Sequence, residues 1–575
     1  MLATTTEGLG LGDAYSATID RIKGQGGEKA RLGMATLMWI SHSERPLKPD
    51  ELCHALAVEI GSPNFDADNL PSINLLIVCC QGLVAVEKEA STVRFIHFTV
   101  QEFLRAHPEF FGPAHSTIAE TCLSYLNSEQ VKAPWARPDP DLQSTPFLEY
   151  SSLHWGAHAK RELSNCAKLL ALKLFDDYQN HVSIKVLLGA KGVYRYHIDL
   201  DQPPPFSGLH CASFFGIVEI VACLVEAEDY DVNQEDCVGN TPLLWAAENG
   251  HEGVVEVLLG RGDINPKKSD AFGRTPLWRA SWNGHEGVVK TLIQRDDIDP
   301  DTSDFFDQTP LWCAALNGQE GVVEILLGRD DVDPDKPNDD GDTPLRCASW
   351  NGEEGVVKIL LGRNDVHPDK PNDDGKTPLW GAARNGQEGV VKILLGRDEV
   401  NPEKPNSNGK TPLWAAARHG HEGVVRILLN RNDVNPDKPN GNGKTPLWAA
   451  ACNGHEEVVR ILLGRDDVDP DTLNNNGKTP LWAAARHGHE RVVRILLERG
   501  DIDPDKPNCD GGTPLWAAAR NGHEGVVRTL LGRDDVNPHK PDKSGRTPFW
   551  YASKHGHAGV IALLQSGAST TTSAA

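Results

Sequence analysis

The sequence lacks the features that mark several large classes of proteins. None of its 12 cysteines forms a Cys-x-x-Cys pair, and Cys79 and Cys80 are adjacent, so neither a zinc knuckle nor a disulfide framework is predicted. The longest apolar run, residues 73–86, is too short to span a bilayer and contains polar residues. Residues 1–13 have neither the basic start nor the apolar stretch of a secretory signal. We therefore expect a protein of a reducing compartment, cytoplasmic or nuclear, that does not contact membranes.

Positive charge is also scarce. The chain has 57 Lys and Arg against 81 Asp and Glu, which gives a formal net charge of −24. Bulk electrostatic attraction to DNA or RNA is therefore not expected, although a local basic face remains open. A chain of 575 residues is too long for one ordinary core, so several domains or a repeat array are predicted.

A 34-residue repeat accounts for most of the chain. Thr-Pro recurs at this interval from Thr241 to Thr547, and the segment at Ser207 is a degenerate earlier copy, which makes eleven units. In one unit, Thr411 and Pro412 begin a first helix and Gly420 ends it. A second, more apolar helix and a polar loop follow. Because no unit can bury its own helix faces, stacking into an elongated solenoid on the order of 100 Å is predicted.

The segments of the form TPLWAAARHGHEGVVRILL resemble the ankyrin repeat over roughly 360 residues. The resemblance implies a helix–turn–helix unit with a projecting hairpin, and binding of protein partners. Each unit is one residue longer than the common 33. Eight units carry Trp where the family usually has His, so the family's Thr–His hydrogen bond cannot form there. We expect these residues to build a structural ladder and not a ligand cage: Trp278, Trp312, Trp380, Trp414, Trp448, Trp482, Trp516 and Trp550.

The first 205 residues have no such period and suggest a winged helix. The predicted helices are 29–40, 48–60, 69–80, 98–106 and 117–127, with a hairpin of 83–87 and 93–97 between the third and fourth. The third helix has almost no basic residues, so DNA contact by this domain is not expected. The segments TLMWISHSERPLKPDELCHAL and HFTVQEFL resemble the winged-helix region that follows the NACHT domain in fungal NOD-like receptors. Those receptors end in ankyrin arrays and are associated with non-self recognition.

The predicted fold is mostly α, with an N-terminal winged-helix-like helical domain followed by an ankyrin-repeat α-solenoid. The expected parts are a flexible N-terminus (1–27), the winged-helix-like domain (28–130), a linker with capping helices (131–205), eleven repeats (206–567) and a disordered tail (568–575). The prolines of 134–145 indicate the linker, and 148–188 is expected to be helical. No NACHT domain precedes the winged helix, so the chain is expected to be a truncated relative or to have lost its start.

Several motifs resemble parts of nucleotide-binding or metal-binding sites, but each lacks residues that such a site needs. Gly-Lys-Thr occurs four times, but each copy lacks the earlier glycine that a phosphate loop needs. His-Gly-His and Asp-Asp pairs lack the spacing of metal or calcium ligands. No catalytic constellation stands out. We therefore expect no enzyme, no cofactor, no metal and no small-molecule substrate.

Ankyrin proteins usually bind through the hairpin tips and the ends of the first helices, and these positions differ along the array. The predicted binding residues are apolar in early units and basic in later ones: Phe272, Trp282, Phe305, Phe306, Leu316, Trp350, Lys410, Arg418, Lys444, Lys478, Arg486, Arg520, Arg546 and Lys554. The aromatic residues either pack against neighbouring tips or form a hot spot. The basic residues either form a solvated face or meet an acidic partner.

The sequence thus predicts a non-enzymatic protein–protein interaction module, the recognition and regulatory part of a fungal NOD-like receptor lineage. The alternative is an ankyrin scaffold or transcription co-regulator that acts in the nucleus. The sequence does not identify the protein partner.

Overall fold

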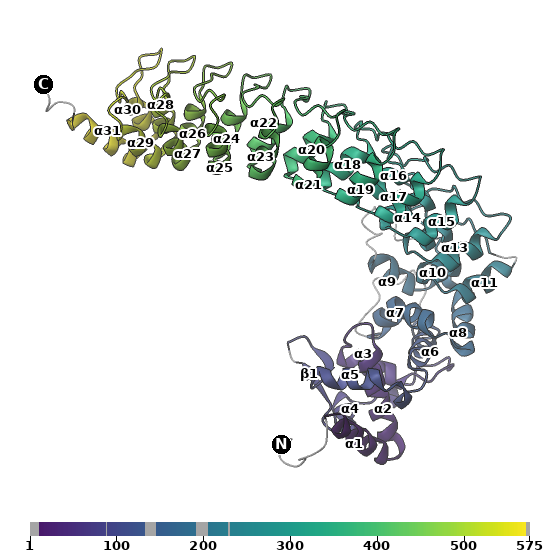
Figure 1. Ribbon diagram of the computed structural model, residues 1–575. Coiled ribbons are helices and arrows are strands. Elements are labelled where there is room, and N and C mark those ends of the chain that lie inside the picture. Colours follow the sequence, from purple (N-terminus) through teal and green to yellow (C-terminus); the bar gives the residue numbers. More distant parts are fainter. Residues whose placement is uncertain (1–10, 88, 133–144, 191–204, 228–229, 571–575) are drawn as a thin grey trace. The chain divides into compact units, whose positions relative to one another are not determined.

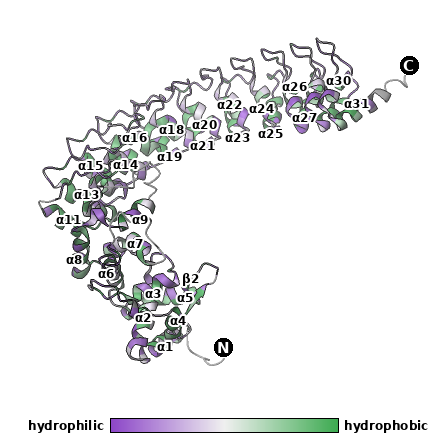
Figure 2. Ribbon diagram, turned by 180° about the vertical axis from the view of Figure 1, so that it is seen from behind, coloured by the Kyte–Doolittle hydropathy of each residue, from purple (hydrophilic) through white to green (hydrophobic). Residues whose placement is uncertain are grey.

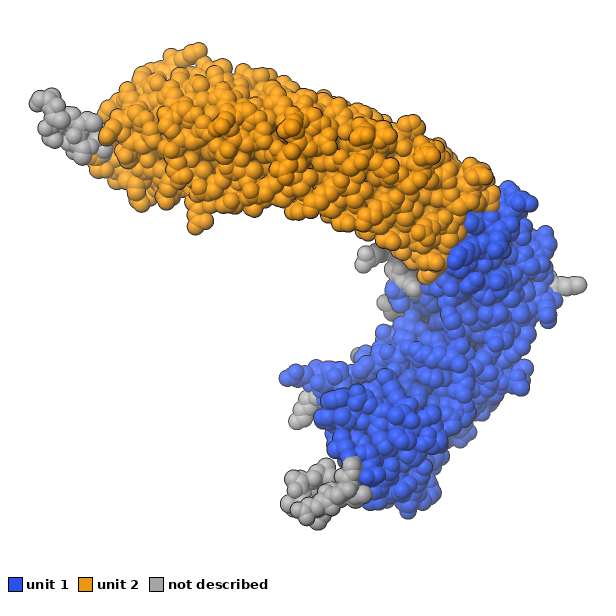
Figure 3. All heavy atoms as spheres, viewed as in Figure 1, with its two compact units in different colours: residues 1–280, 287–298 blue, residues 281–286, 299–575 orange. Residues whose placement is uncertain are grey.

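The structure is a computed structural model that describes residues 11–87, 89–132, 145–190, 205–227 and 230–570 (Figure 1). It divides into two compact units (Figure 3). Unit 1 comprises 1–280 with 287–298, and unit 2 comprises 281–286 with 299–575. Both are built of helices, and the described residues contain one two-stranded sheet.

Unit 1 begins with the helices and hairpin of a winged helix. Its elements are α1 (Leu11–Gly24), α2 (Gly27–His42), α3 (Pro49–Ala57), α4 (Ile73–Cys79), β1 (Val84–Glu87), β2 (Thr92–Phe95), α5 (Phe98–Ala106) and α6 (Ala114–Leu126), with short 3-10 turns at Ala67–Asn69 and Pro108–Phe110. The strands are antiparallel, with Val84 opposite Phe95. The predicted order of three helices followed by a hairpin is confirmed.

Two segments of unit 1 differ from the expectation. The N-terminus was expected to be flexible to residue 27, but α1 forms there because Ile19 and Ile22 are buried against the domain. The helix predicted to start at residue 69 starts at Ile73. Pro71 precedes the Ser72 cap, whose side chain accepts a hydrogen bond from the Leu75 N–H.

The stretch predicted to be helical over 148–188 consists of α7 (Leu148–Arg161), α8 (Asn165–Phe175) and α9 (Ser183–Ala190), with a 3-10 turn at Tyr178–Asn180. Helices α7 and α8 pack against the first helix of the repeat array, α10. The approach is close, because a Cβ atom at Gly156 would overlap the Phe215 ring. Of the predicted proline-containing linker (134–145), residues 134–144 lie outside the described residues, as do residues 191–204 of the segment predicted to hold the capping helices.

The repeats alternate a first and a second helix. Unit 1 contains α10 (Gly208–Phe215), α11 (Val218–Glu226), α12 (Pro242–Glu248) and α13 (Glu252–Leu259), and the next pair, α14 (Pro276–Asn283) and α15 (Glu286–Ile293), crosses the division between the units. Unit 2 continues with α16 (Pro310–Leu316), α17 (Glu320–Leu327), α18 (Pro344–Asn351), α19 (Glu354–Leu361), α20 (Pro378–Asn385), α21 (Glu388–Leu395), α22 (Pro412–His419), α23 (Glu422–Leu429), α24 (Pro446–Asn453), α25 (Glu456–Leu463), α26 (Pro480–His487), α27 (Glu490–Leu497), α28 (Pro514–Asn521), α29 (Glu524–Leu531), α30 (Pro548–His555) and α31 (Ala558–Thr570). The tail was expected to be disordered from 568, but α31 runs to Thr570; 571–575 lie outside the described residues.

The local signals of each repeat act as predicted. The Thr411 side chain accepts a hydrogen bond from the Trp414 N–H, Pro412 follows at the first helical position, and Gly420 ends α22 at a φ of 79°. Helix α22 packs on α20 and α24, and α23 packs on α21 and α25. Figure 2 shows the hydrophobic stretches concentrated in these helices. Stacking therefore buries faces that one repeat leaves open, as Val424 and Leu428, both 0% exposed, illustrate.

Tryptophan side chains link consecutive repeats. Four indole Nε1–H groups of unit 2 donate to the backbone carbonyl 30 residues ahead, at 2.9–3.1 Å: Trp312 to Asp342, Trp380 to Lys410, Trp414 to Lys444 and Trp482 to Gly512. In unit 1, His210 makes the equivalent contact with the Asn240 carbonyl at 3.2 Å. Trp thus replaces His as the donor at these four positions, so the hydrogen-bonded ladder is present at four of the eight tryptophans for which it was predicted. Within the described chain, the buried Nε1 atoms of Trp448 and Trp516 have no partner, and Trp550 is 39% exposed.

A second set of links lies at the ends of the second helices. Arg465 donates to the Leu429 carbonyl of the preceding repeat at 2.9 Å and forms an ion pair with Asp467 at 2.7 Å. The same arrangement recurs at Arg363, Arg431, Arg499 and Arg533. In each of these loops the arginine therefore pairs with the aspartate two residues after it.

Replacing Trp414 with Ala should destabilise unit 2 by about 3–5 kcal/mol, because the ring is 2% exposed and its hydrogen bond is lost. The matched control Trp550→Ala should cost about 1 kcal/mol, because its ring is 39% exposed. Urea denaturation followed by circular dichroism measures both free energies of unfolding. Equal losses would contradict the ladder as a source of stability.

Three histidines of unit 1 are buried in the neutral form. The Nδ1 atoms of His158 and His115 are hydrogen-bonded at 2.8 Å, and the Tyr150 hydroxyl lies 2.9 Å from His158 Nε2. Burial, reinforced by His115 and Arg161, lowers the pKa of His158 to about 3. Burial likewise lowers the pKa of His181 and of His210 to about 4.

Unit 1 should therefore lose stability as the pH falls. A folded-state pKa below the unfolded value of 6.5 means that the unfolded chain binds more protons below pH 6.5. At about pH 5 each of these histidines should cost about 2 kcal/mol relative to neutral pH. Urea denaturation read by hydrogen exchange in α6 and α7 measures this, and His158→Gln should flatten the dependence. The exposed-site control His539→Gln should leave it unchanged; an unaltered slope in His158→Gln would contradict the prediction.

Candidate protein-interaction surface

Hairpin tips and first-helix ends of unit 2 enclose hollows between consecutive repeats. One hollow, of about 350 Å³, is lined by Gln308, Trp312, Leu316, Asn338, Asp340, Asp342, Arg346, Cys347 and Trp350. Another, of about 170 Å³, is lined by Lys478, Trp482, Arg486, Asn508, Asp510, Trp516, Ala517, Arg520 and Asn521. Gln308 of the first hollow and Lys478 of the second occupy the same position of the repeat, five periods of 34 residues apart. We call the first the apolar–acidic hollow and the second the basic hollow.

The apolar–acidic hollow contains two residues predicted from the sequence, Leu316 and Trp350, both half-buried. Arg346 occupies the position that is Trp in most repeats and is 5% exposed. Its guanidinium forms an ion pair with Asp342 at 2.6 Å and lies over the Trp350 ring at 5.4 Å. Burial raises the pKa of Asp342, and Arg346 opposes that effect. The hollow thus presents aromatic and carboxylate groups.

The aromatic tip next to this hollow projects into solvent. Phe305 is 75% exposed and Phe306 is 53% exposed. Asp307 takes the place of the turn glycine at a φ of 55°. The Phe306 carbonyl accepts a hydrogen bond from the Asp339 N–H at 3.1 Å, so the backbone is fixed while both rings stay accessible. Packing against neighbouring tips therefore does not explain why residues 305 and 306 are aromatic.

The other predicted aromatic residues are less prominent. Trp282 is 37% exposed at the end of α14. Phe272 belongs to unit 1, where its ring is half-buried and the Arg274 guanidinium lies 4.4 Å from its centroid. The structure therefore groups Leu316 with Trp350, and Phe305 with Phe306, but it assigns Phe272 to the other compact unit.

The eight predicted basic residues lie over indole rings four positions away in the sequence. Lys410 and Arg418 lie over Trp414 at 4.9 and 5.5 Å, and the same pairing places Lys478 and Arg486 over Trp482. The remaining pairs are Lys444 over Trp448, Arg520 over Trp516, and Arg546 and Lys554 over Trp550. These contacts hold the cations in place on the tip and helix-end face. We call the eight residues the basic row.

The basic row has no ion pairs among the described residues, in contrast to other cations of unit 2. Most loop arginines, such as Arg465, have an aspartate partner. Some exposed cations of the second helices form an ion pair with the glutamate four residues earlier, as Lys358 does with Glu354 at 3.6 Å and Arg494 with Glu490 at 2.7 Å. Burial together with the neighbouring cations, Arg418 foremost, lowers the pKa of Lys410. The basic row is therefore a positively charged surface, and its side chains repel one another.

Sequence reasoning missed the acidic residues that mark one end of the basic row. The tips of the two repeats before it carry Asp339, Asp340, Asp373 and Asp374. Arg384 extends the row, because it lies over both Trp350 and Trp380. Reading the same tip and helix-end positions for acidic residues as well as for aromatic and basic ones would have found them. The face thus changes from aromatic to acidic to basic along unit 2.

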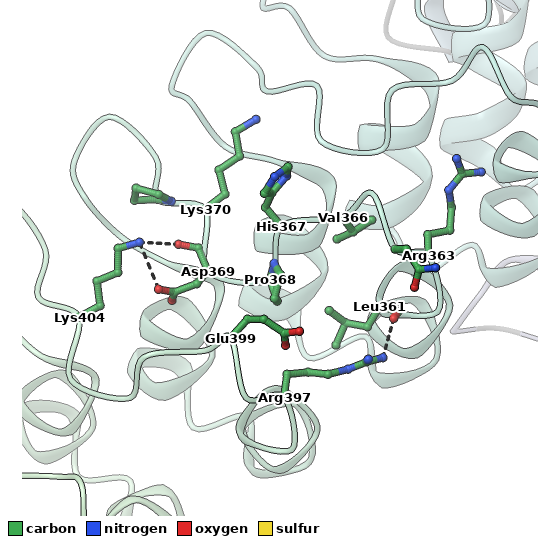
Figure 4. Close-up of a pocket in the computed structure, with 12 residues that line it drawn as sticks. Leu361, Arg363, Val366, His367, Pro368, Asp369, Lys370, Arg397, Glu399 and Lys404 are labelled. Atoms are coloured by element: carbon green, nitrogen blue, oxygen red, sulfur yellow. Dashed lines mark hydrogen bonds and ion pairs between the residues drawn. The ribbon is translucent and has the colours of Figure 1, made fainter.

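Another hollow of unit 2, of about 660 Å³, lies among the loops that follow the second helices (Figure 4). Its cations are bound to the scaffold. Lys404 donates to the Asp369 carbonyl at 2.8 Å, and Arg397 donates to the Leu361 carbonyl at 2.5 Å. The lysine contact recurs at Lys336, Lys370, Lys438, Lys506 and Lys540. We therefore attribute this hollow to the links between repeats and not to a binding site.

The His-Gly-His motif, which suggested a metal site, is also part of the scaffold. In the His-Gly-His turns the second histidine bonds to a carbonyl of the preceding repeat, as His421 does to Arg384 at 2.8 Å. Among the described residues, no group of three or more His, Cys, Asp or Glu side chains could hold a metal ion. Within the same ranges, no helix has both the length and the apolarity that crossing a membrane requires.

Comparisons with known proteins agree with this architecture. The model for ankyrin repeats (3 copies) matches residues 209–304, 296–372, 354–438, 431–508 and 501–574, so the chain belongs to the ankyrin repeat family. Residues 21–110 match the model for the GPI inositol-deacylase winged helix domain, a type found in NACHT proteins. The comparison with curated proteins gave no match. The predicted fold class, a mostly helical winged-helix domain followed by an ankyrin solenoid, is confirmed.

Replacing Phe305 and Phe306 with Ser should leave the free energy of unfolding within about 0.5 kcal/mol per residue, because both rings are exposed. Urea denaturation of the double variant beside the unmodified protein measures this. A loss of about 2 kcal/mol or more per residue would show that the rings are packing elements of the array.

Proposed function

We propose that this ankyrin protein is the recognition and regulatory part of a fungal NOD-like receptor lineage. Ankyrin arrays indicate protein–protein interaction, and this winged-helix type occurs in NACHT proteins. In the proposal the ankyrin face binds a protein ligand, and the winged-helix region connects to regulatory partners in the cytoplasm. No catalytic step, cofactor, nucleic acid or small-molecule substrate is part of it.

The observation that carries the proposal is the change of chemistry along one repeating surface. The two hollows have the same backbone positions, yet one presents Leu316 and Trp350 and the other presents Arg486 and Arg520. Aromatic and arginine side chains dominate the binding energy of protein interfaces. Burial between repeats does not account for these differences, because Leu316 and Trp350 are only half-buried and Arg486 and Arg520 are exposed.

The second candidate is an ankyrin scaffold or transcription co-regulator that acts in the nucleus. A basic row on an otherwise acidic chain is compatible with contacts to chromatin-associated proteins. Imaging of a fluorescent fusion distinguishes the two, since the first predicts cytoplasmic signal and the second predicts nuclear accumulation.

Co-purification from a fungal cell tests the proposed function. Three tagged chains are compared with the unmodified protein: the aromatic variant Phe305→Ser/Phe306→Ser, the basic-face variant Arg418→Glu/Arg486→Glu/Arg520→Glu, and the control Lys392→Glu/Arg426→Glu/Arg528→Glu on the second helices. The control has the same charge change in the same unit. Circular dichroism verifies that each variant folds.

We expect a protein that co-purifies with the unmodified chain and with the control, and that at least one face variant loses. Retention of every specific partner by both folded face variants would contradict a role for this face. A partner confined to the nucleus would favour the scaffold or co-regulator.

A further inference from the structure

We propose that the basic row binds an extended acidic polypeptide segment with an aspartate or glutamate at about every third residue. The proposal deepens the proposed function, because it gives the chemistry of the partner at that face. It rests on three features of unit 2: unpaired charge, repeat spacing and a hollow at which cations converge.

The charge of the row favours a carboxylate-rich ligand. Its eight cations have no carboxylate within ion-pairing distance among the described residues, and they are positioned in advance by the indole rings below them. A bound segment of carboxylates would relieve the repulsion between neighbours such as Lys410 and Lys444. Because the side chains are already held over rings, less side-chain freedom is lost on binding.

The spacing of the row selects an extended chain. Each repeat from Thr411 to Thr547 carries at least one cation of the row, at its tip or at its first-helix end. Neighbouring repeats are about 10 Å apart, the usual distance between packed helices. An extended polypeptide advances about 3.3 Å per residue, so every third side chain meets the next repeat. A helical ligand advances about 1.5 Å per residue and would need acidic residues about seven positions apart.

The basic hollow supplies an anchor for one carboxylate. Lys478, Arg486 and Arg520 line it together with a single acidic residue, Asp510. Its volume of about 170 Å³ is large enough for an aspartate or glutamate side chain. Asn508 and Asn521 also line it and add polar surface. Arginine forks match a carboxylate with two parallel hydrogen bonds, which makes this the strongest single contact along the row.

The acidic tips set the limit of the ligand. Asp339, Asp340 and Asp373 precede the basic row and would repel further carboxylates, and Asp374 beside them neutralises Lys376 through an ion pair at 2.6 Å. The segment is therefore confined to the repeats that begin at Thr411 and beyond. Five repeats begin there (Thr411, Thr445, Thr479, Thr513 and Thr547), which corresponds to a segment of about 15 residues in extended form.

A peptide fits this surface better than a nucleic acid does. Proteins that bind single strands stack bases on accessible aromatic faces. Here the indoles of Trp414, Trp482 and Trp516 are 2–7% exposed and lie under cations, so they provide no stacking platform. The remaining attraction would be to phosphates alone, on a chain with a net charge of −24.

Fluorescence anisotropy with synthetic probes and the intact chain tests the proposal. The probe is a labelled peptide of five Glu-Ser-Gly triplets, and its control has the same composition with all glutamates adjacent. We expect the spaced peptide to bind at least about tenfold more tightly than the clustered one, and both to weaken as salt rises from about 50 to about 300 mM. Arg486→Glu/Arg520→Glu should weaken the spaced peptide at least about tenfold, whereas the control Lys392→Glu/Arg426→Glu should not.

Three results would overturn the proposal: no binding of the spaced peptide, equal binding of both peptides, or tighter binding of an oligothymidylate of equal charge. The first two would leave the proposed function in place if the intact chain still co-purified a protein through its aromatic or basic face. The proposed function fails separately if no specific partner depends on either face, whatever the peptide does.

Discussion

The burial of a first-helix tryptophan under the next hairpin, in four repeats with a hydrogen bond to a hairpin carbonyl, is the contact on which the rest of unit 2 depends. In Trp414 and three equivalent residues the indole reaches the carbonyl 30 positions ahead, and His210 makes the same contact in unit 1. The bond sets the distance between a first helix and the following tip. It also leaves the flat face of each indole beneath the tip and helix-end residues four positions away. At Trp414 and Trp482 the indole that links two repeats is thus also the platform for four cations of the basic row, Lys410, Arg418, Lys478 and Arg486. The other four cations lie over Trp448, Trp516 and Trp550.

Charge is divided between two sides of the repeats. On the loop side, arginines such as Arg465 bind a carbonyl and an aspartate, so their charge is neutralised within the scaffold. On the tip side, cations such as Arg486 lie over rings and have no carboxylate partner among the described residues. An acidic chain therefore keeps a concentrated positive surface. Neutralised charges contribute to stacking, and unpaired charges remain available to a ligand.

Local signals in the sequence were sufficient for most elements. Thr-Pro caps, terminal glycines and apolar spacing placed the repeat helices, and alternating residues placed the β1–β2 hairpin. Two elements differ from the expectation. Helix α1 has Tyr15, Ile19 and Ile22 at helical spacing, but whether this short apolar face is buried depends on the rest of the domain. Helix α4 starts later than expected because of two local signals, Pro71 and the Ser72 cap.

The candidate surface also depends partly on local sequence and partly on tertiary structure. The sequence by itself determined the period of 34, the ankyrin class, the winged-helix order and the positions at which repeats differ, because these follow from spacing and capping along the chain. Only the tertiary structure decided which differences form a surface. It exposed Phe305 and Phe306, buried Arg346 beside Asp342, and brought Lys478, Arg486 and Arg520 to one hollow. Exposure, ion pairing and convergence depend on residues a whole repeat away, so the order of residues within one repeat does not specify them.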